Sequence, residues 1–73
     1  MNKYLIRFNR SRGEPGRGTH DHAWRVFENG KEYLFKHINI SVNIVDEQSG
    51  DDYNICCYGT MTIDKETSTA IIK

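Results

Sequence analysis

One stretch decides the fold of this chain: HAWRVFENGKEYLFKH, residues 22–37. At its centre lies Asn29-Gly30, a pair typical of a type I′ hairpin turn because both residues accept positive φ angles. The cross-strand pairs that follow from a two-residue turn are Val26 with Tyr33 and Trp24 with Phe35. Pairs of aromatic and β-branched side chains stabilise a sheet by about 0.2–1 kcal/mol each. The stretch therefore predicts a β-hairpin.

Alternating apolar residues extend the strand pattern to both sides of this hairpin. The segments with a period of two are 3–9, 38–44, 53–63 and 68–72. No long segment shows a convincing helical period, so any helix is expected to be short. The connections are expected to be a flexible loop rich in glycine and arginine (10–21), an acidic turn (46–52) and a second hairpin turn (64–67).

Two irregularities in the alternation predict bends. The apolar residues of 38–44 are even-numbered, whereas Tyr33 and Phe35 are odd-numbered. Because a strand has a period of two, this change predicts a bulge, a sharp bend or a move between two sheets near His37. Gly59 lies on the apolar face of 53–63, which indicates a bend or the close approach of another backbone.

These patterns predict a single all-β domain spanning residues 1–73, with about five antiparallel strands. The alternatives for its architecture are a small barrel or a bent meander sheet, similar in size to an SH3-like or OB-like domain. Both faces of the central hairpin carry large apolar side chains, with Trp24 on one face and Phe27 and Leu34 on the other. Unless a barrel closes, the second face is expected to be an interface, with Phe27 and Leu34 at its centre.

Composition argues against several classes of protein. The two cysteines, Cys56 and Cys57, are adjacent and point to opposite faces of a strand, which makes a disulfide between them awkward. A reducing, cytoplasmic location is therefore expected, and no apolar run is long enough to span a membrane. No histidine lies beside the cysteines in the sequence, and paired carboxylates occur only in turns. We expect no catalytic site and no cofactor.

Charge is distributed unevenly along a chain of zero net charge. Residues 1–25 hold six Lys or Arg against two Asp or Glu, and residues 26–73 hold four against eight. A positive end can aid solubility, meet the negative end of another copy, or bind nucleic acid. Tyr4, Tyr53 and Tyr58 could stack on bases beside it. The candidate nucleic-acid-binding residues are Arg7, Arg10, Arg12, Arg17 and Arg25.

Histidines provide one candidate metal site. His20 and His22 form an H-x-H pair, whose rings point to one face of an extended strand. The hairpin register, if it continues, places His37 opposite His22. Three imidazoles from two strands can bind zinc or a similar metal. The simpler alternative is a polar strand end with solvated histidines.

Three segments carry a resemblance to a known group of proteins: WRVFENGKEYL (24–34), NICCYG (54–59) and TAII (69–72). Together they resemble small proteins of T4-like phages that infect marine cyanobacteria. The resemblance implies a phage-encoded protein made in a bacterial cytoplasm. It implies no activity, cofactor or binding residue.

Three functional hypotheses follow from the sequence. The first is a small non-enzymatic interaction module that forms a homo-oligomer or binds another phage or host protein. The second is a nucleic-acid-binding small barrel that uses the arginine loop. The third is a metal-binding domain with a three-histidine site.

Overall fold

The computed structural model describes residues 1–9 and 23–73, and in these residues the protein is all-β, without a helix. None of the described segments is a helix long and apolar enough to cross a membrane. The strands are β1 (Asn2–Asn9), β2 (Trp24–Glu28), β3 (Lys31–Phe35), β4 (His37–Ile40), β5 (Ile44–Gln48), β6 (Asp52–Gly59), β7 (Met61–Asp64) and β8 (Thr69–Ile72).

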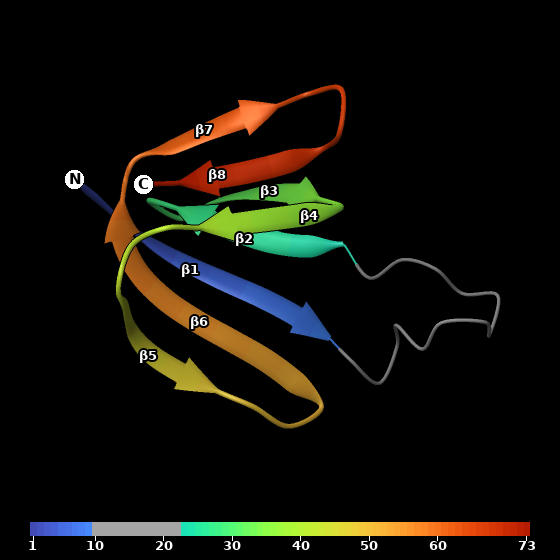
Figure 1. Cartoon of the computed structure of the whole chain (residues 1–73). Helices are drawn as coiled ribbons and strands as arrows, with labels where there is room; N and C mark the ends of the chain where they lie inside the picture. Colours follow the sequence, from blue (N-terminus) through green and yellow to red (C-terminus); the bar gives the residue numbers. More distant parts are fainter. Residues whose placement is uncertain (10–22) are drawn as a thin grey trace, which may run out of the picture.

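The strands form two sheets, which do not close into a barrel (Figure 1). The larger sheet has the order β3-β2-β1-β6-β5, and every neighbouring pair in it is antiparallel. The smaller sheet has the order β4-β8-β7, with β4 parallel and β7 antiparallel to β8. The all-β prediction is confirmed, but the described residues form eight strands where about five were expected, because the segments 31–44 and 53–63 each divide between the two sheets.

The central hairpin has the turn and register that the sequence predicts. Asn29 and Gly30 have φ angles of 51° and 81°, as a type I′ turn requires. The observed partners are Val26 with Tyr33 and Trp24 with Phe35. Local turn chemistry therefore determines the pairing of β2 with β3.

The change of alternation near His37 marks a move between the two sheets. β3 ends at Phe35 in the larger sheet, and β4 begins at His37 in the smaller one. The backbone N–H groups of Lys36 and His37 both donate to the carbonyl oxygen of Ser68, at 2.9 and 3.1 Å. These bonds hold the corner against the turn that precedes β8.

The prediction of one strand over 38–44 followed by an acidic turn over 46–52 is wrong. β4 ends at Ile40, and β5 runs from Ile44 to Gln48 through the first residues of the expected turn. All five side chains of β5 are exposed. A strand at the edge of a sheet with no buried side chain shows no apolar alternation, so its sequence resembles that of a loop.

The core lies between the two sheets. Its fully buried side chains come from β1, β2 and β6 of the larger sheet and from β8 of the smaller one. A group of neighbouring aromatic rings extends it, with the Trp24 ring centred 4.4 Å from that of Phe8, in a tilted arrangement, and 5.9 Å from that of Tyr53, edge to face. The core residues are Tyr4, Ile6, Val26, Phe35, Ile55, Cys57, Ala70 and Ile72.

Gly59 closes the corner between β6 and β7. A Cβ atom there would lie 2.8 Å from Cγ2 of Ile72 and 2.9 Å from the carbonyl oxygen of Lys73. Thr60 and Lys73 exchange two backbone hydrogen bonds next to it, at 2.8 and 3.1 Å. Both the bend and the close approach predicted from the sequence are therefore present.

Candidate interaction surface

The side of the larger sheet that faces away from the core is called here the outer face. Its side chains alternate along each strand with those of the core, because successive residues of a strand point to opposite sides. Among the exposed large apolar residues of the chain are Leu5, Leu34 and Tyr58 of this face. Its members are Lys3, Leu5, Arg7, Arg25, Phe27, Glu32, Leu34, Asp46, Gln48, Asn54, Cys56 and Tyr58.

An apolar row crosses the middle of the outer face. Leu5 of β1 lies directly opposite Phe27 of β2 on one side and Cys56 of β6 on the other. Carboxylates border the row, because Phe27 pairs with Glu32 of β3 and Cys56 pairs with Asp46 of β5. The apolar strip thus has an acidic residue at each end.

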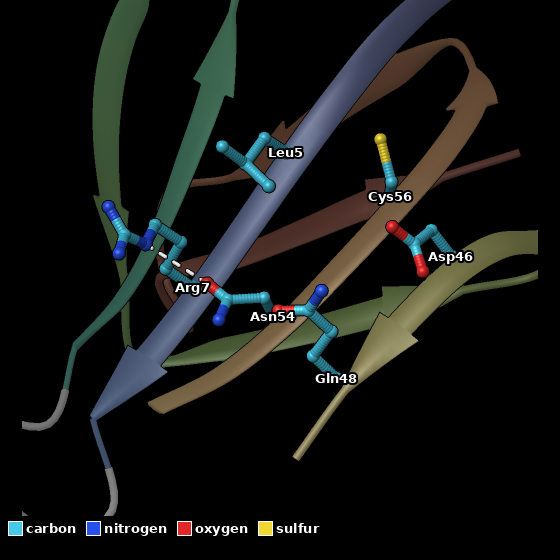
Figure 2. Close-up of a pocket in the computed structure, with 6 residues that line it drawn as sticks. All are labelled: Leu5, Arg7, Asp46, Gln48, Asn54 and Cys56. Carbon is cyan, nitrogen blue, oxygen red and sulfur yellow. Dashed lines mark hydrogen bonds between the residues drawn. The ribbon is translucent and has the colours of Figure 1, made fainter. Parts of the chain in front are cut away.

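A polar row runs beside the apolar one. Arg7 lies opposite Arg25 on β2 and opposite Asn54 on β6. The Nε–H of Arg7 donates to Oδ1 of Asn54 at 3.0 Å (Figure 2). Within residues 1–9 and 23–73, neither arginine has a carboxylate partner. Like charges directly opposite one another destabilise a sheet, and an anion placed between the two guanidinium groups would reduce their repulsion.

Two shallow hollows lie on the outer face, on either side of Leu5. One of about 330 Å³ is shown in Figure 2, and its lining residues are Leu5, Arg7, Asp46, Gln48, Asn54 and Cys56. The other, of about 400 Å³, is lined by Lys3, Leu5, Phe27, Asn29 and Gly30. The first combines guanidinium, amide and carboxylate groups, whereas the second is mainly apolar.

Two titratable groups of the core have raised pKa values. Burial raises the pKa of the Cys57 thiol, and the neighbouring Cys56 raises it further. Burial also raises the pKa of the Tyr4 hydroxyl, which donates to Oε2 of Glu28 at 2.5 Å and accepts from the N–H of Met61 at 3.1 Å. Both groups are therefore held in the neutral form, which is the opposite of the activation that a nucleophile needs.

The outer edge of β3 is a second feature of this surface. β3 is the end strand of the larger sheet. In an antiparallel ladder, alternate residues direct their backbone groups to the neighbouring strand. Lys31, Tyr33 and Phe35 direct theirs to β2, because a two-residue turn is closed by the hydrogen-bonded pair Glu28 and Lys31. The backbone groups of Glu32 and Leu34 therefore point outward.

Several residues predicted as sites are found apart from one another or outside the described residues. Arg7 and Arg25 are brought together, whereas Arg10, Arg12, Arg17, His20 and His22 lie outside the described residues. His37 begins β4 and pairs with Thr69 of β8, so the hairpin register does not continue to it. The described parts of the chain contain no cluster of three or more His, Cys, Asp or Glu residues that could hold a metal.

The predicted aromatic and interface residues divide between the two faces. Tyr4 is fully buried, so the expectation that it is available for stacking is wrong. Tyr53 is half-buried and donates its hydroxyl to Glu47 at 2.9 Å, and Tyr58 is exposed. Phe27 and Leu34 both lie on the outer face, Phe27 half-buried and Leu34 60 % exposed.

Sequence reasoning missed the amides and the carboxylate that line the first hollow. Gln48 and Asp46 reach it only because β5 is a strand paired with β6. The signal that could have found them is that residues 49–51 are a connection short enough for a hairpin turn, which would make the residues before them a strand paired with β6. Comparison of the chain with protein-family models, curated proteins and solved structures found no match.

Proposed function

We propose that the protein is a small, non-enzymatic interaction module that associates with a second copy through the β3 side of its outer face. The observation that supports this proposal best is the position of Leu34. It is 60 % exposed on an end strand, next to Arg25 and diagonal to Phe27. A leucine that becomes fully buried contributes about 1.5–3 kcal/mol, so contact between two copies here would stabilise a dimer.

The same proposal includes a cellular setting. Both cysteines are free, and unpaired thiols suit a reducing compartment such as the cytoplasm. A phage-encoded protein that acts in its host would meet that condition. Another phage or host protein could then occupy the same surface in place of the second copy.

The substitution Leu34→Lys tests the proposal. We expect the wild-type protein to dimerise in a concentration-dependent manner and Leu34→Lys to weaken the dimer at least about tenfold, because the contact loses its apolar centre and gains like charges. Sedimentation equilibrium across a wide range of concentrations measures this change.

Ile63→Lys is the matched control for this substitution. Ile63 is an exposed apolar residue, 44 % accessible, on β7 of the smaller sheet. We expect this variant to dimerise like the wild type. A protein that is monomeric at every concentration, or a Leu34→Lys variant that dimerises as strongly as Ile63→Lys, contradicts the proposal.

A second candidate function is the binding of single-stranded nucleic acid, and the adjacent arginines favour it. Arg7 and Arg25 lie side by side on the outer face, with the amide of Asn54 in the same row and Tyr58 exposed on the same face. Guanidinium groups bind phosphates, and an exposed tyrosine can stack on a base. The acidic Glu32 and Asp46 on the same face oppose such binding, so this function ranks second.

Oligonucleotide titration tests this second candidate at about 50 and 200 mM salt, the range over which phosphate contacts weaken strongly. If the arginines bind phosphates, Arg7→Gln combined with Arg25→Gln lowers the affinity and reduces the salt dependence. Lys65→Gln, which alters an exposed cation in the β7–β8 turn, is the control. Absence of binding at the lower salt concentration excludes the second candidate.

A further inference from the structure

The outer edge of β3 has backbone groups available for another strand. Glu32 and Leu34 direct their N–H and C=O groups away from β2. Among the described residues, no backbone hydrogen bond outside the sheets involves either of them. An open edge of this kind is a template for the addition of a strand from another chain.

The side chains along this edge are complementary to themselves. Glu32, Leu34 and Lys36 are spaced by two residues, and all three are exposed. If two copies of β3 run antiparallel about a two-fold axis at Leu34, the two Leu34 side chains meet at the axis. Lys36 follows β3 at the bend into the smaller sheet, and its N–H is bonded to Ser68. Its exposed side chain would meet Glu32 of the other copy just beyond the end of the backbone ladder, and these opposite charges attract each other.

The opposite face of the same strand suits this register as well. Tyr33 of one copy would lie opposite Phe35 of the other. Within one copy the two rings are already stacked, with centroids 6.4 Å apart. Phe35 is only 5 % exposed, so the contact on this face would be made mainly by the half-buried Tyr33.

Other pairings of the edges place charges unfavourably. An axis at Glu32 puts the two Glu32 carboxylates opposite each other, and an axis at Tyr33 puts each Glu32 opposite a leucine. Two copies of β5, the other end strand of the larger sheet, would bring together Asp46 and Glu47 from both chains. Like charges directly opposite one another are destabilising.

We infer that two copies of this chain pair through the edges of β3, antiparallel and about a two-fold axis at Leu34, to form one continuous ten-stranded sheet. This inference rests on the proposed self-association and specifies its geometry. The N–H of Leu34 in each copy donates to the carbonyl oxygen of Leu34 in the other. Because only residues 33–35 of β3 face each other in this register, the interface is small and the dimer is in equilibrium with its monomer.

Charge exchange across the axis tests the register. We expect Glu32→Lys and Lys36→Glu, each alone, to weaken dimerisation about tenfold, because each places like charges opposite one another twice. The double variant restores opposite charges, so its dissociation constant should return to within about threefold of the wild-type value. A double variant that dimerises as weakly as the single variants would overturn the register. Exchange of the two charges restores dimerisation only if the two residues lie close to each other across the axis.

Cross-linking provides an independent test that leaves the charges unchanged. Residues directly opposite in an antiparallel pair have Cα atoms about 4.5–5.5 Å apart, which is within reach of a disulfide. We expect Leu34→Cys, in a Cys56→Ser background, to form a disulfide-linked dimer on mild oxidation. Ile63→Cys in the same background is the control and should stay monomeric on a non-reducing gel.

The outcomes separate this inference from the function on which it rests. If the wild-type protein dimerises, but the Leu34→Cys variant does not cross-link and the charge-exchange variants dimerise like the wild type, the β3 pairing is overturned while self-association itself stands. A protein that is monomeric at every concentration overturns both. Cross-linking together with charge rescue supports both.

Discussion

Cys56 and Cys57 are neighbours in β6 but face different surroundings. Cys57 is fully buried in the core, whereas Cys56 is half-buried in the apolar row of the outer face. The alternation of the strand predicts this division from the sequence alone. Tyr4 lies on the same face of β1 as Ile6, and both are buried in the core. The sequence alone does not tell which aromatic residues of a small sheet stay exposed, which is why its prediction that Tyr4 is available for stacking is wrong.

The raised pKa of Cys57 predicts a dependence of stability on pH. Because the folded state holds the proton more tightly than the unfolded state, the contribution of Cys57 is fully present below the usual thiol pKa of about 8.5. It decreases as the pH rises through the pKa of the folded state. We expect the free energy of unfolding, measured in urea, to fall as the pH rises above about 8.5.

Cys57→Ala separates this effect from the general loss of stability at high pH. The variant is less stable at every pH, because a buried side chain is shortened. Its free energy of unfolding should nevertheless decline less steeply in that pH range than that of the wild type. A decline of the same slope in both proteins would show that another group is responsible.

Corners between strands determine how the elements are arranged. The chain leaves the larger sheet at Lys36 and again at Gly59. At Lys36 the change in apolar alternation indicates the bend, and at Gly59 a glycine on an apolar face indicates it. Gly59 has no room for a side chain, because Ile72 and Lys73 lie too close. The corner therefore depends on a contact between segments distant in the sequence.

Gly59→Ala should destabilise the protein by about 1–3 kcal/mol, since an added methyl group forces neighbouring backbone or side chains to shift. Urea denaturation measures the change. Ser41→Ala, at an exposed position in the connection between β4 and β5, is the control and should change stability by less than about 0.5 kcal/mol. Equal stability of the two variants would mean that the corner relaxes without cost.

The elements differ in how far the sequence predicts them. The β2–β3 hairpin is specified by Asn29 and Gly30 and by pairs close in sequence, so its register is predicted correctly. β5 is not predicted, because none of its side chains is buried. The sequence therefore predicts only part of the outer face. Phe27, Leu34, Arg7 and Arg25 follow from strand alternation, whereas Asp46 and Gln48 require the pairing of β5 with β6.

At the scale of the whole molecule, two sheets share one core. The larger sheet cannot bury its inner face without Ala70 and Ile72 of β8, which are fully buried against it. The parallel pairing of β4 with β8 joins distant segments and leaves no mark in local sequence. This is the physical reason why the sequence predicts a move between two sheets only as one alternative, beside a bulge or a bend, and why it leaves a barrel open.

Ile72→Ala should reduce the free energy of unfolding by about 2–5 kcal/mol, because it opens a cavity between the two sheets. In a domain of this size such a loss is a large part of the total stability. Ile63→Ala, at a position that is 44 % exposed on the neighbouring strand, should cost less than about 1 kcal/mol. Similar losses in both variants would contradict a core located between the sheets.

The position of β8 between β4 and β7 also sets an order for folding. The β2–β3 hairpin closes through a two-residue turn, whereas His37 must find Thr69, about thirty residues further along the chain. Contacts between distant segments form slowly, and on a ribosome the smaller sheet cannot assemble before residues 69–72 have emerged. Until then Tyr4, Ile6 and Val26 have no second layer over them. The nascent chain therefore passes through a period in which both faces of the larger sheet are open to aggregation.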